Sequence, residues 1–238
     1  MRAIPPAEYN ERLFAPRSLR GWYHLRRFRW LADSLRALRM SPDSILEMGC
    51  FDAKTIEHLP RIPSRYLGFD AGWEGGLDAA RKMWSGNIDF EFRLCRTASD
   101  LQAGGETFDA VICMDTLEHV PPGDMETYLD FLTETTRGRL FITVPNEKGV
   151  VFALKYLLKA ALGGNDPYSF GEFWNTALGR LSRIQRREHK GFDYEIVIAS
   201  IKNRFASVTA TGIPFPRLPL YLNLSVGIIG DGPRTSRR

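Results

Sequence analysis

The strongest constraint on the fold is an alternation of short apolar runs with helix-length gaps along residues 44–144. Five runs of four to six residues occur: Ser44–Met48, Tyr66–Phe69, Phe90–Cys95, Ala110–Met114 and Leu140–Val144. Two more strand-like runs, Phe205–Thr211 and Leu222–Ile229, follow later in the chain. Strands that alternate with helices are typical of βαβ units. The pattern therefore predicts an α/β protein whose parallel sheet is covered by helices on both faces.

The segments around these runs predict additional helices. Apolar residues recur at three- and four-residue steps over residues 18–40, and Val150–Leu162 reads as an apolar helix that carries two lysines. A glycine- and proline-containing breaker follows, then a basic, helix-like stretch to about residue 190 and a helix over Asp193–Lys202. The predicted organisation is an N-terminal helical cap (1–42), a core (43–148), a helical insert (149–190), a return to the sheet (191–231) and a frayed tail (232–238).

Composition excludes several classes of protein. With 44% hydrophobic and 25% charged residues, the 238-residue chain is neither disordered nor collagen-like. No apolar run approaches the ~20 residues that span a bilayer, and the N-terminus lacks the apolar core of a signal peptide. The three cysteines show no metal-ligand spacing, so we expect buried free thiols. A cytoplasmic location is the resulting expectation.

A strand, a glycine turn and a helix form the most informative motif. Residues Ile45–Thr55 read ILEMGCFDAKT, and Gly49 allows the chain to turn sharply and approach a ligand without a Cβ in the way. The following helix brings backbone N–H groups close to a nucleotide-like ligand. Asp70 closes the next strand, at a spacing where an acidic side chain can accept hydrogen bonds from both hydroxyls of a ribose.

At these residues the chain resembles the class I S-adenosylmethionine (SAM)-dependent methyltransferases. Their first motif has the form acidic-x-Gly-x-Gly-x-Gly; Glu47 and Gly49 match it, whereas Phe51 and Ala53 replace the later glycines. Three further segments are similar to the quinone-biosynthesis branch: Phe108–Val120 (FDAVICMDTLEHV), Leu140–Asn146 and Glu188–Phe192. The resemblance implies a Rossmann-like, doubly wound, mostly parallel seven-stranded sheet with helices on both faces, an N-terminal helical cap and a helical insert after the fifth strand.

The resemblance also implies a cofactor site for SAM, with S-adenosylhomocysteine (SAH) as product. Carried over by position, Glu47 holds the methionine end of SAM and Asp70 binds the ribose. The remaining implied contacts are Gly49 and Cys50 along the backbone, Ala71 against the adenine, Asp100 at the adenine amino group, and Met114 and Asp115 beneath the methyl group. A structural role, such as a helix cap for Glu47 or a loop residue for Asp100, is the alternative for each carboxylate.

Methyl transfer mainly requires orientation and exclusion of water, and a base is needed only for a poorly acidic hydroxyl or a protonated amine. His119 is the predicted base because its ordinary pKa of about 6.5 suits proton removal near neutrality. Glu118 and Asp115 are neighbours that orient or replace it. His119 as a purely structural residue is the alternative, and His24 and His58 are interpreted as ordinary helix residues. The spacing of the sequence predicts no metal ligands.

The acceptor is predicted to be a hydroxyl of a small molecule, such as a sugar or a lipid-linked glycan. The Asn/Asp-Pro-Pro-Tyr/Phe motif of the nucleic-acid base methyltransferases is missing after the fourth strand, so a nucleic acid is less expected. The cap and the insert are expected to form the acceptor pocket. The apolar 150–162 helix either packs in the core or makes peripheral contact with a membrane.

Other functions stay open. They are an RNA or protein methyltransferase, a non-catalytic methyltransferase-like scaffold, and a nicotinamide-dependent dehydrogenase, which the missing third glycine disfavours. Two basic clusters are interpreted as solvated helix faces or as sites for an anionic partner. They comprise Arg17, Arg20, Arg26, Arg27, Arg29, Arg36 and Arg39 in the first, and Arg180, Arg183, Arg186, Arg187 and Lys190 in the second.

Overall fold

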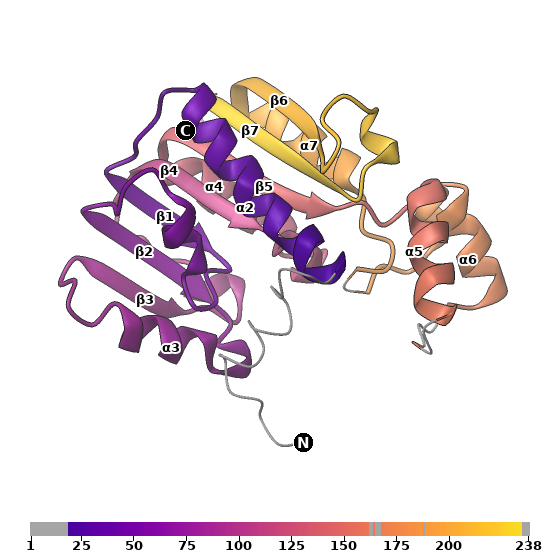
Figure 1. The fold of residues 1–238 in the computed structure, drawn as a ribbon, viewed down its shortest axis with the longest axis horizontal. Helices are drawn as coiled ribbons and strands as arrows, with labels where there is room; N and C mark the ends of the chain where they lie inside the picture. Colours follow the sequence, from indigo (N-terminus) through magenta and orange to yellow (C-terminus); the bar gives the residue numbers. More distant parts are fainter. Residues whose placement is uncertain (1–18, 162–163, 165–167, 188, 235–238) are drawn as a thin grey trace.

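A computed structural model describes residues 19–161, 164, 168–187 and 189–234 of the chain. Seven strands form one sheet in the order β3-β2-β1-β4-β5-β7-β6 (Figure 1). The first five strands run parallel, and β7 is antiparallel to both β5 and β6. Their bounds are β1 Ser44–Met48, β2 Arg65–Asp70, β3 Phe90–Leu94, β4 Phe108–Met114, β5 Thr136–Pro145, β6 Phe205–Ile213 and β7 Ser225–Pro233. The predicted Rossmann-like fold is confirmed.

Helices cover the sheet on both faces because successive strand residues point to opposite sides. In β1, Ile45 packs into the core beneath α2 (Leu19–Ala37) and α3 (Gly76–Met83). Leu46 packs into the core beneath α4 (Met125–Glu134) and α7 (Tyr194–Arg204). Figure 1 shows α2 lying across one face and α4 and α7 on the other.

The helix α2 belongs to the core. Residues 1–18, which precede it, lie outside the described residues. Phe28, Leu31 and Leu35 are buried and recur at helical spacing, so one stripe of the helix faces the sheet. The Trp30 ring lies where a Cβ on Gly227 of β7 would stand, 2.2 Å from that position. A side chain at residue 227 would therefore displace the helix from the sheet.

The helix expected directly after β1 is only a short 3₁₀ helix, η1 (Lys54–His58). Pro60 and Pro63 follow within a few residues, and proline cannot continue a helix. The segment therefore ends early, and α2 covers the neighbouring part of the sheet. This part of the sequence prediction was wrong.

Differences also occur after residue 177. The basic stretch predicted as helical forms α6 (Phe170–Ala177), and the helix stops where Gly179 adopts a positive φ of 71°. A short 3₁₀ helix, η5 (Leu181–Arg183), and an isolated bridge between Arg187 and Lys190 follow. The last strand begins at Ser225 rather than at residue 222, and it includes residues 232 and 233 of the expected tail. Residues 235–238 lie outside the described residues.

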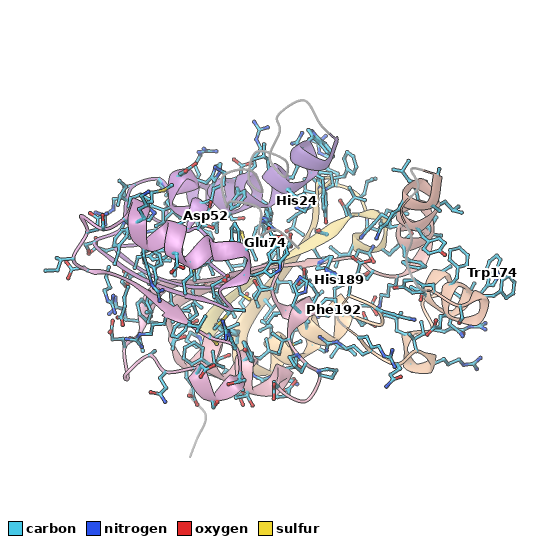
Figure 2. The ribbon with its side chains drawn as sticks, turned by 90° about the horizontal axis from the view of Figure 1, so that it is seen from below. His24, Asp52, Glu74, Trp174, His189 and Phe192 are labelled. Atoms are coloured by element: carbon cyan, nitrogen blue, oxygen red, sulfur yellow. The ribbon has the colours of Figure 1, made fainter. Side chains whose placement is uncertain are left out.

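The insert forms a hairpin of α5 (Gly149–Ala161) and α6 that projects beyond the end of β5 (Figure 1). Its own small core is aromatic: the rings of Phe152, Tyr156, Tyr168 and Phe173 lie 4.9–5.9 Å apart between centroids. Figure 2 places Trp174 at the outer end of this hairpin. Among the described residues, we find no helix with the length and hydropathy needed to cross a bilayer.

Candidate active site

A cavity of about 850 Å³ opens at the carboxyl ends of β1, β2 and β4, beneath the N-terminal part of α2. This is the edge where parallel α/β sheets bind ligands. Every residue implied for the cofactor or the chemistry lines it except Asp100. The lining members of that set are Glu47, Gly49, Cys50, Asp70, Ala71, Met114, Asp115, Glu118 and His119.

The glycine turn after β1 is tightly constrained. Gly49 has a φ of 75°, and a Cβ at this position would lie 2.0 Å from the Thr116 hydroxyl oxygen. The amides of Gly49 and Cys50 both donate to the carbonyl of Phe69 at the end of β2, at 2.7 and 3.0 Å. The turn is thereby held against the neighbouring strand and the loop after β4.

The two positions that depart from the glycine motif keep a glycine-like backbone. Phe51 has a φ of 48° and Ala53 a φ of 59°, both in the left-handed region that costs a non-glycine residue about 1 kcal/mol. The Phe51 ring packs over Gly76 of α3, where a Cβ would lie 2.3 Å from it, and beside the Trp73 ring. The aromatic side chain therefore leaves the turn toward α3, and the turn keeps its path despite the substitutions.

Asp70 connects two loops of the cavity. One carboxylate oxygen accepts from the amide of Phe51 at 2.9 Å, and the other accepts from the amide of Gly72 at 2.8 Å. Each oxygen retains a lone pair for a further donor. Asp70 is thus both a support for the glycine turn and an acceptor that faces the cavity.

Glu47 is 2% exposed at the end of β1. Its carboxylate accepts hydrogen bonds from the hydroxyls of Thr55 and Tyr66, both at 2.5 Å. Burial outweighs these bonds and raises the pKa of Glu47 to about 7. The side chain therefore gains or loses its charge near neutral pH.

Asp115 forms an ion pair that sequence reasoning missed. Arg27 of α2 donates to its carboxylate at 2.6 Å, and the Thr143 hydroxyl donates at 2.8 Å. Burial opposes ionisation, but Arg27 holds the pKa of Asp115 below its usual value. Asp115 is therefore charged and paired with Arg27. One interpretation of the first basic cluster placed Arg27 on a solvated helix face, but the structure places it in this ion pair beside the cavity.

The cap helix contributes two more side chains to the cavity. Tyr23 shares a 2.6 Å hydrogen bond with Ser225 of β7, and burial raises the pKa of its phenol. His24, interpreted from the sequence as an ordinary helix residue, also lines the cavity (Figure 2). The sequence did not indicate that Tyr23 and His24 line the cavity, because their position depends on how α2 crosses the sheet.

The structure does not bring Asp100 into the cavity. Its carboxylate accepts from the amides of Arg96 and Thr97 and from the Thr97 hydroxyl, so it caps the 3₁₀ helix Ala98–Asp100. These hydrogen bonds to Arg96 and Thr97 lower the pKa of Asp100. The geometry supports the capping role that was the alternative at this position.

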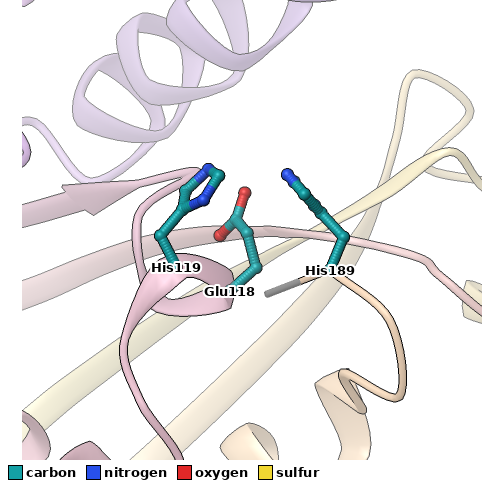
Figure 3. A group of neighbouring side chains, drawn as sticks. All are labelled: Glu118, His119 and His189. Carbon is teal, nitrogen blue, oxygen red and sulfur yellow. The ribbon is translucent and has the colours of Figure 1, made fainter. Parts of the chain in front are cut away.

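Glu118 and His119 follow β4 on the 3₁₀ helix η4 (Leu117–His119), and His189 reaches them from the loop before α7 (Figure 3). The rings of His119 and His189 lie 4.6 Å apart between centroids, nearly perpendicular. Glu118 is 2% exposed, and burial, reinforced by Asp115, raises its pKa well above the usual range. Figure 2 places His189 near the centre of the molecule. The sequence predicted two of these three residues.

Comparisons with known proteins find methyltransferases that are similar to this chain. Residues 45–137 match the family model described as "Methyltransferase domain". Human mitochondrial ubiquinone biosynthesis O-methyltransferase is 26% identical over 167 residues, which cover 68% of this chain and 44% of the relative. The Mesorhizobium japonicum ubiquinone biosynthesis O-methyltransferase is 34% identical over 82 residues, 34% of this chain and 32% of the relative. The chain spans less than half the length of these curated relatives.

Solved structures share the fold. A SAM-dependent methyltransferase from Clostridium acetobutylicum superposes with a TM-score of 0.62 at 13% identity, covering 95% of this chain and 97% of the other. Magnesium protoporphyrin IX methyltransferase from Synechocystis, solved with SAH, superposes with a TM-score of 0.55 at 15% identity, covering 89% and 84%. These likenesses establish that the chain has the fold of these methyltransferases. The family match and the curated relatives, taken with this fold, agree with the resemblance that the motifs indicated.

Proposed function

We propose that this chain, which has the class I methyltransferase fold and a matching methyltransferase domain, transfers a methyl group from SAM to a hydroxyl of a small molecule. The observation that carries the proposal is that Glu47, Asp70 and the Gly49 turn line one cavity. The relatives whose names specify ubiquinone biosynthesis O-methylation support oxygen as the methylated atom.

Two carboxylates of the cavity suit the groups that SAM presents. SAM carries positive charge on its sulfur and its amino group, and Glu47 and Asp70 both line the space. Asp70 keeps acceptor capacity for a ribose diol, because each of its oxygens accepts only one backbone hydrogen bond. The absence of a Cβ at Gly49 lets the Thr116 side chain pack directly against the turn.

Each residue has a proposed part. Glu47 holds the amino group of SAM, Asp70 binds the ribose, and Gly49, Cys50 and Ala71 shape the pocket. Met114, at the end of β4, is proposed to lie beneath the methyl group, and Asp115 with Arg27 fixes the loop that follows. Asp100 is not part of the proposed site, since it caps its own helix.

When bound, SAM supplies a methyl group on an activated sulfur: a carbon–sulfur bond breaks, an oxygen–carbon bond forms, and the sulfur of SAH keeps the electron pair. The chain orients the two reactants and excludes water. Arg27 and Tyr23 of α2 close one side of the cavity. His119 is the proposed base that takes the hydroxyl proton, with Glu118 beside it.

The insert is proposed to present an acceptor that is apolar or lipid-linked, such as a lipid-linked glycan. Large apolar side chains on α5 and α6 are exposed: Val150, Leu154, Leu157, Leu158, Phe170 and Trp174. Lys159, Arg180 and Arg183 add positive charge to the same part of the chain, which complements anionic headgroups. We propose that this apolar face, α5 and α6 together, rests on an anionic membrane surface.

The test follows transfer of an isotope-labelled methyl group from SAM to a panel of hydroxyl probes, including catechol, simple sugars and an undecaprenyl-linked sugar. Label should appear in an ether product with the wild type and fall at least about 100-fold in Asp70→Asn. Asp78→Asn, exposed on α3, is the matched control and should retain activity. A folded wild type that neither binds SAM nor transfers label would overturn the proposal and favour a non-catalytic binding domain.

A further inference from the structure

The loop after β5 places a carboxylate and an ammonium group in the cavity. Glu147 and Lys155 both line it, and they form an ion pair at 3.0 Å. Their side chains are 15% and 32% exposed, so solvent screens the two charges only in part. Glu47 and Asp70 lie at the ends of β1 and β2, whereas Glu147 follows β5, two strands beyond β1 in the sheet. The pair therefore lies on the other side of β4 from the proposed cofactor site.

The backbone on either side of Glu147 is anchored. Asn146 is buried, and its side chain donates to the carbonyl of Asn223 at 2.9 Å. Lys148 pairs with Asp193, the N-cap of α7, at 2.6 Å. A side chain held on a fixed loop recognises a ligand with little loss of conformational entropy. Glu147 is thus a preformed contact of the cavity.

Lys155 comes from α5, which the chain enters directly after this loop (Figure 1). Its ammonium donates to the carboxylate of Glu147 and to the carbonyl of Asn146, the latter at 3.1 Å. Two of its three N–H bonds are used in this way, and one is left for a ligand. Its charge is compensated by Glu147, so it is poorly placed to hold an anion. Arg27, which also lines the cavity, is likewise paired, with Asp115.

An unsatisfied nitrogen lies beside the pair. Nδ1 of His189 is inaccessible to solvent, has no hydrogen-bond partner among the described residues and lies 3.8 Å from the Glu147 carboxylate. Buried polar atoms are normally paired, so an orphan atom on a cavity-lining residue indicates a ligand group. A hydroxyl supplies what is missing, because its oxygen can donate to a carboxylate and accept from a ring N–H at the same time.

Methyl transfer determines which reactant reaches this side of the cavity. The acceptor oxygen attacks the methyl carbon from the side opposite to the sulfur, so the two reactants approach from opposite directions. With SAM over β1 and β2 and its methyl group over Met114 of β4, the acceptor approaches from β5. The identity of the ligand as the acceptor thus rests on the proposed function. Its chemistry rests on the charges of Glu147 and Lys155.

We propose that Glu147, held by Lys155, selects an acceptor that presents neutral hydroxyls and rejects one that presents an anionic group at this position. The hydroxyls donate to Glu147 and accept from Lys155 or His189. An anionic group meets the like charge of Glu147, while the charge of Lys155 is already compensated. Repulsion of this kind distinguishes ligands of similar shape. Glu147 determines specificity and takes no part in the proton transfer.

The test uses two probes that differ by one charge, catechol and 3,4-dihydroxybenzoate, with the protein saturated with SAH. Titrations followed by NMR of the probe give both dissociation constants. We expect the wild type to bind catechol at least about 10-fold more tightly. Glu147→Gln leaves Lys155 uncompensated and should abolish or reverse this preference. Lys155→Met leaves Glu147 uncompensated and should increase the preference at least about threefold.

Opposite changes in the two variants identify a recognition role, because a purely structural ion pair responds alike to the loss of either partner. Glu147→Asp keeps the negative charge and should keep the preference. Glu195→Gln is the matched control: it removes an exposed carboxylate that pairs with Lys148, and it should also keep the preference. Thermal unfolding checks that each variant is folded.

The outcomes separate the role of Glu147 from the proposed function. Equal binding of the two probes by the wild type, no binding of either probe, or a wild-type preference in folded Glu147→Gln contradicts the role of Glu147 and leaves the proposed methyl transfer standing. If the protein does not bind SAH, the proposed function fails. The titrations are then made without SAH, since neither Glu147 nor Lys155 belongs to the proposed cofactor site, and the same preferences decide whether Glu147 selects by charge.

Discussion

Arg27 and Asp115, 88 residues apart in the sequence, meet at 2.6 Å and join the cap helix α2 to the loop after β4. The pair lies beside the cavity and is largely shielded from solvent, with side-chain exposures of 19% and 16%. Removing one partner of a shielded pair leaves an uncompensated charge. The pair therefore makes the cap a structural part of the site.

This relationship predicts that Arg27→Met destabilises the protein. We expect the free energy of unfolding to fall by about 3 kcal/mol, because Asp115 is left charged and poorly solvated. Urea denaturation measures the change, and the double variant Arg27→Met with Asp115→Asn should recover at least half of it. Arg36→Met, which breaks an exposed pair with Asp33, should stay within about 0.5 kcal/mol of the wild type. An Arg27→Met protein as stable as the wild type would contradict this account.

Glu47 predicts an unusual pH dependence of stability. Its pKa is raised from 4.5 to about 7 in the folded state, so its contribution to stability is fully present below pH 4.5 and is lost as pH rises through about 7. The full loss is about 3 kcal/mol at 1.36 kcal/mol per pKa unit. Glu47→Gln cannot ionise, so its stability relative to the wild type should grow by about 1 kcal/mol between pH 6 and pH 8.

Urea denaturation of wild type and Glu47→Gln at the two pH values tests this. Glu57→Gln, whose carboxylate is half exposed and pairs with Lys54, is the control and should show no such trend. A stability difference between wild type and Glu47→Gln that is constant with pH would show that Glu47 does not titrate in this range. Glu47→Gln should also bind SAH more weakly, since it cannot supply a carboxylate.

The exposed apolar face of α5 and α6 predicts membrane association. Leu154→Glu with Leu158→Glu places two negative charges on this face, and we expect co-sedimentation with anionic vesicles to fall at least about fivefold. Ile88→Glu is the control, because Ile88 is 96% exposed but lies away from the insert. Equal sedimentation of the wild type and the double variant would rule out this surface as the membrane contact.

The strands, the Gly49 turn and the position of Asp70 could be predicted, because each depends on a short stretch of sequence. The apolar runs gave the strands, because buried parallel strands must be apolar on both faces. The turn at Gly49 and the acid at Asp70 were also recognisable, since each depends on one strand end. The motif substitutions at Phe51 and Ala53 did not alter the turn, because both residues adopt positive φ angles.

Contacts between distant segments were not predictable in the same way. Arg27 reaches Asp115 only because α2 crosses the sheet, and His189 reaches Glu118 only through the loop before α7. Asp100 shows the opposite error: its position after β3 matched a family contact, whereas hydrogen bonds to Arg96 and Thr97 use it as a cap. Whether a carboxylate faces the cavity or accepts from nearby backbone amides depends on packing, which a single sequence does not reveal.

Calorimetric titration with SAH tests most directly whether Asp70 forms part of a SAM site. We expect micromolar binding to the wild type and a loss of at least about 100-fold in Asp70→Asn. Asp100→Ala should bind within about twofold of the wild type, because the Asp100 carboxylate only caps a 3₁₀ helix. Thermal unfolding confirms that each variant is folded. Undiminished binding by Asp70→Asn, or no binding by a folded wild type, would contradict the account.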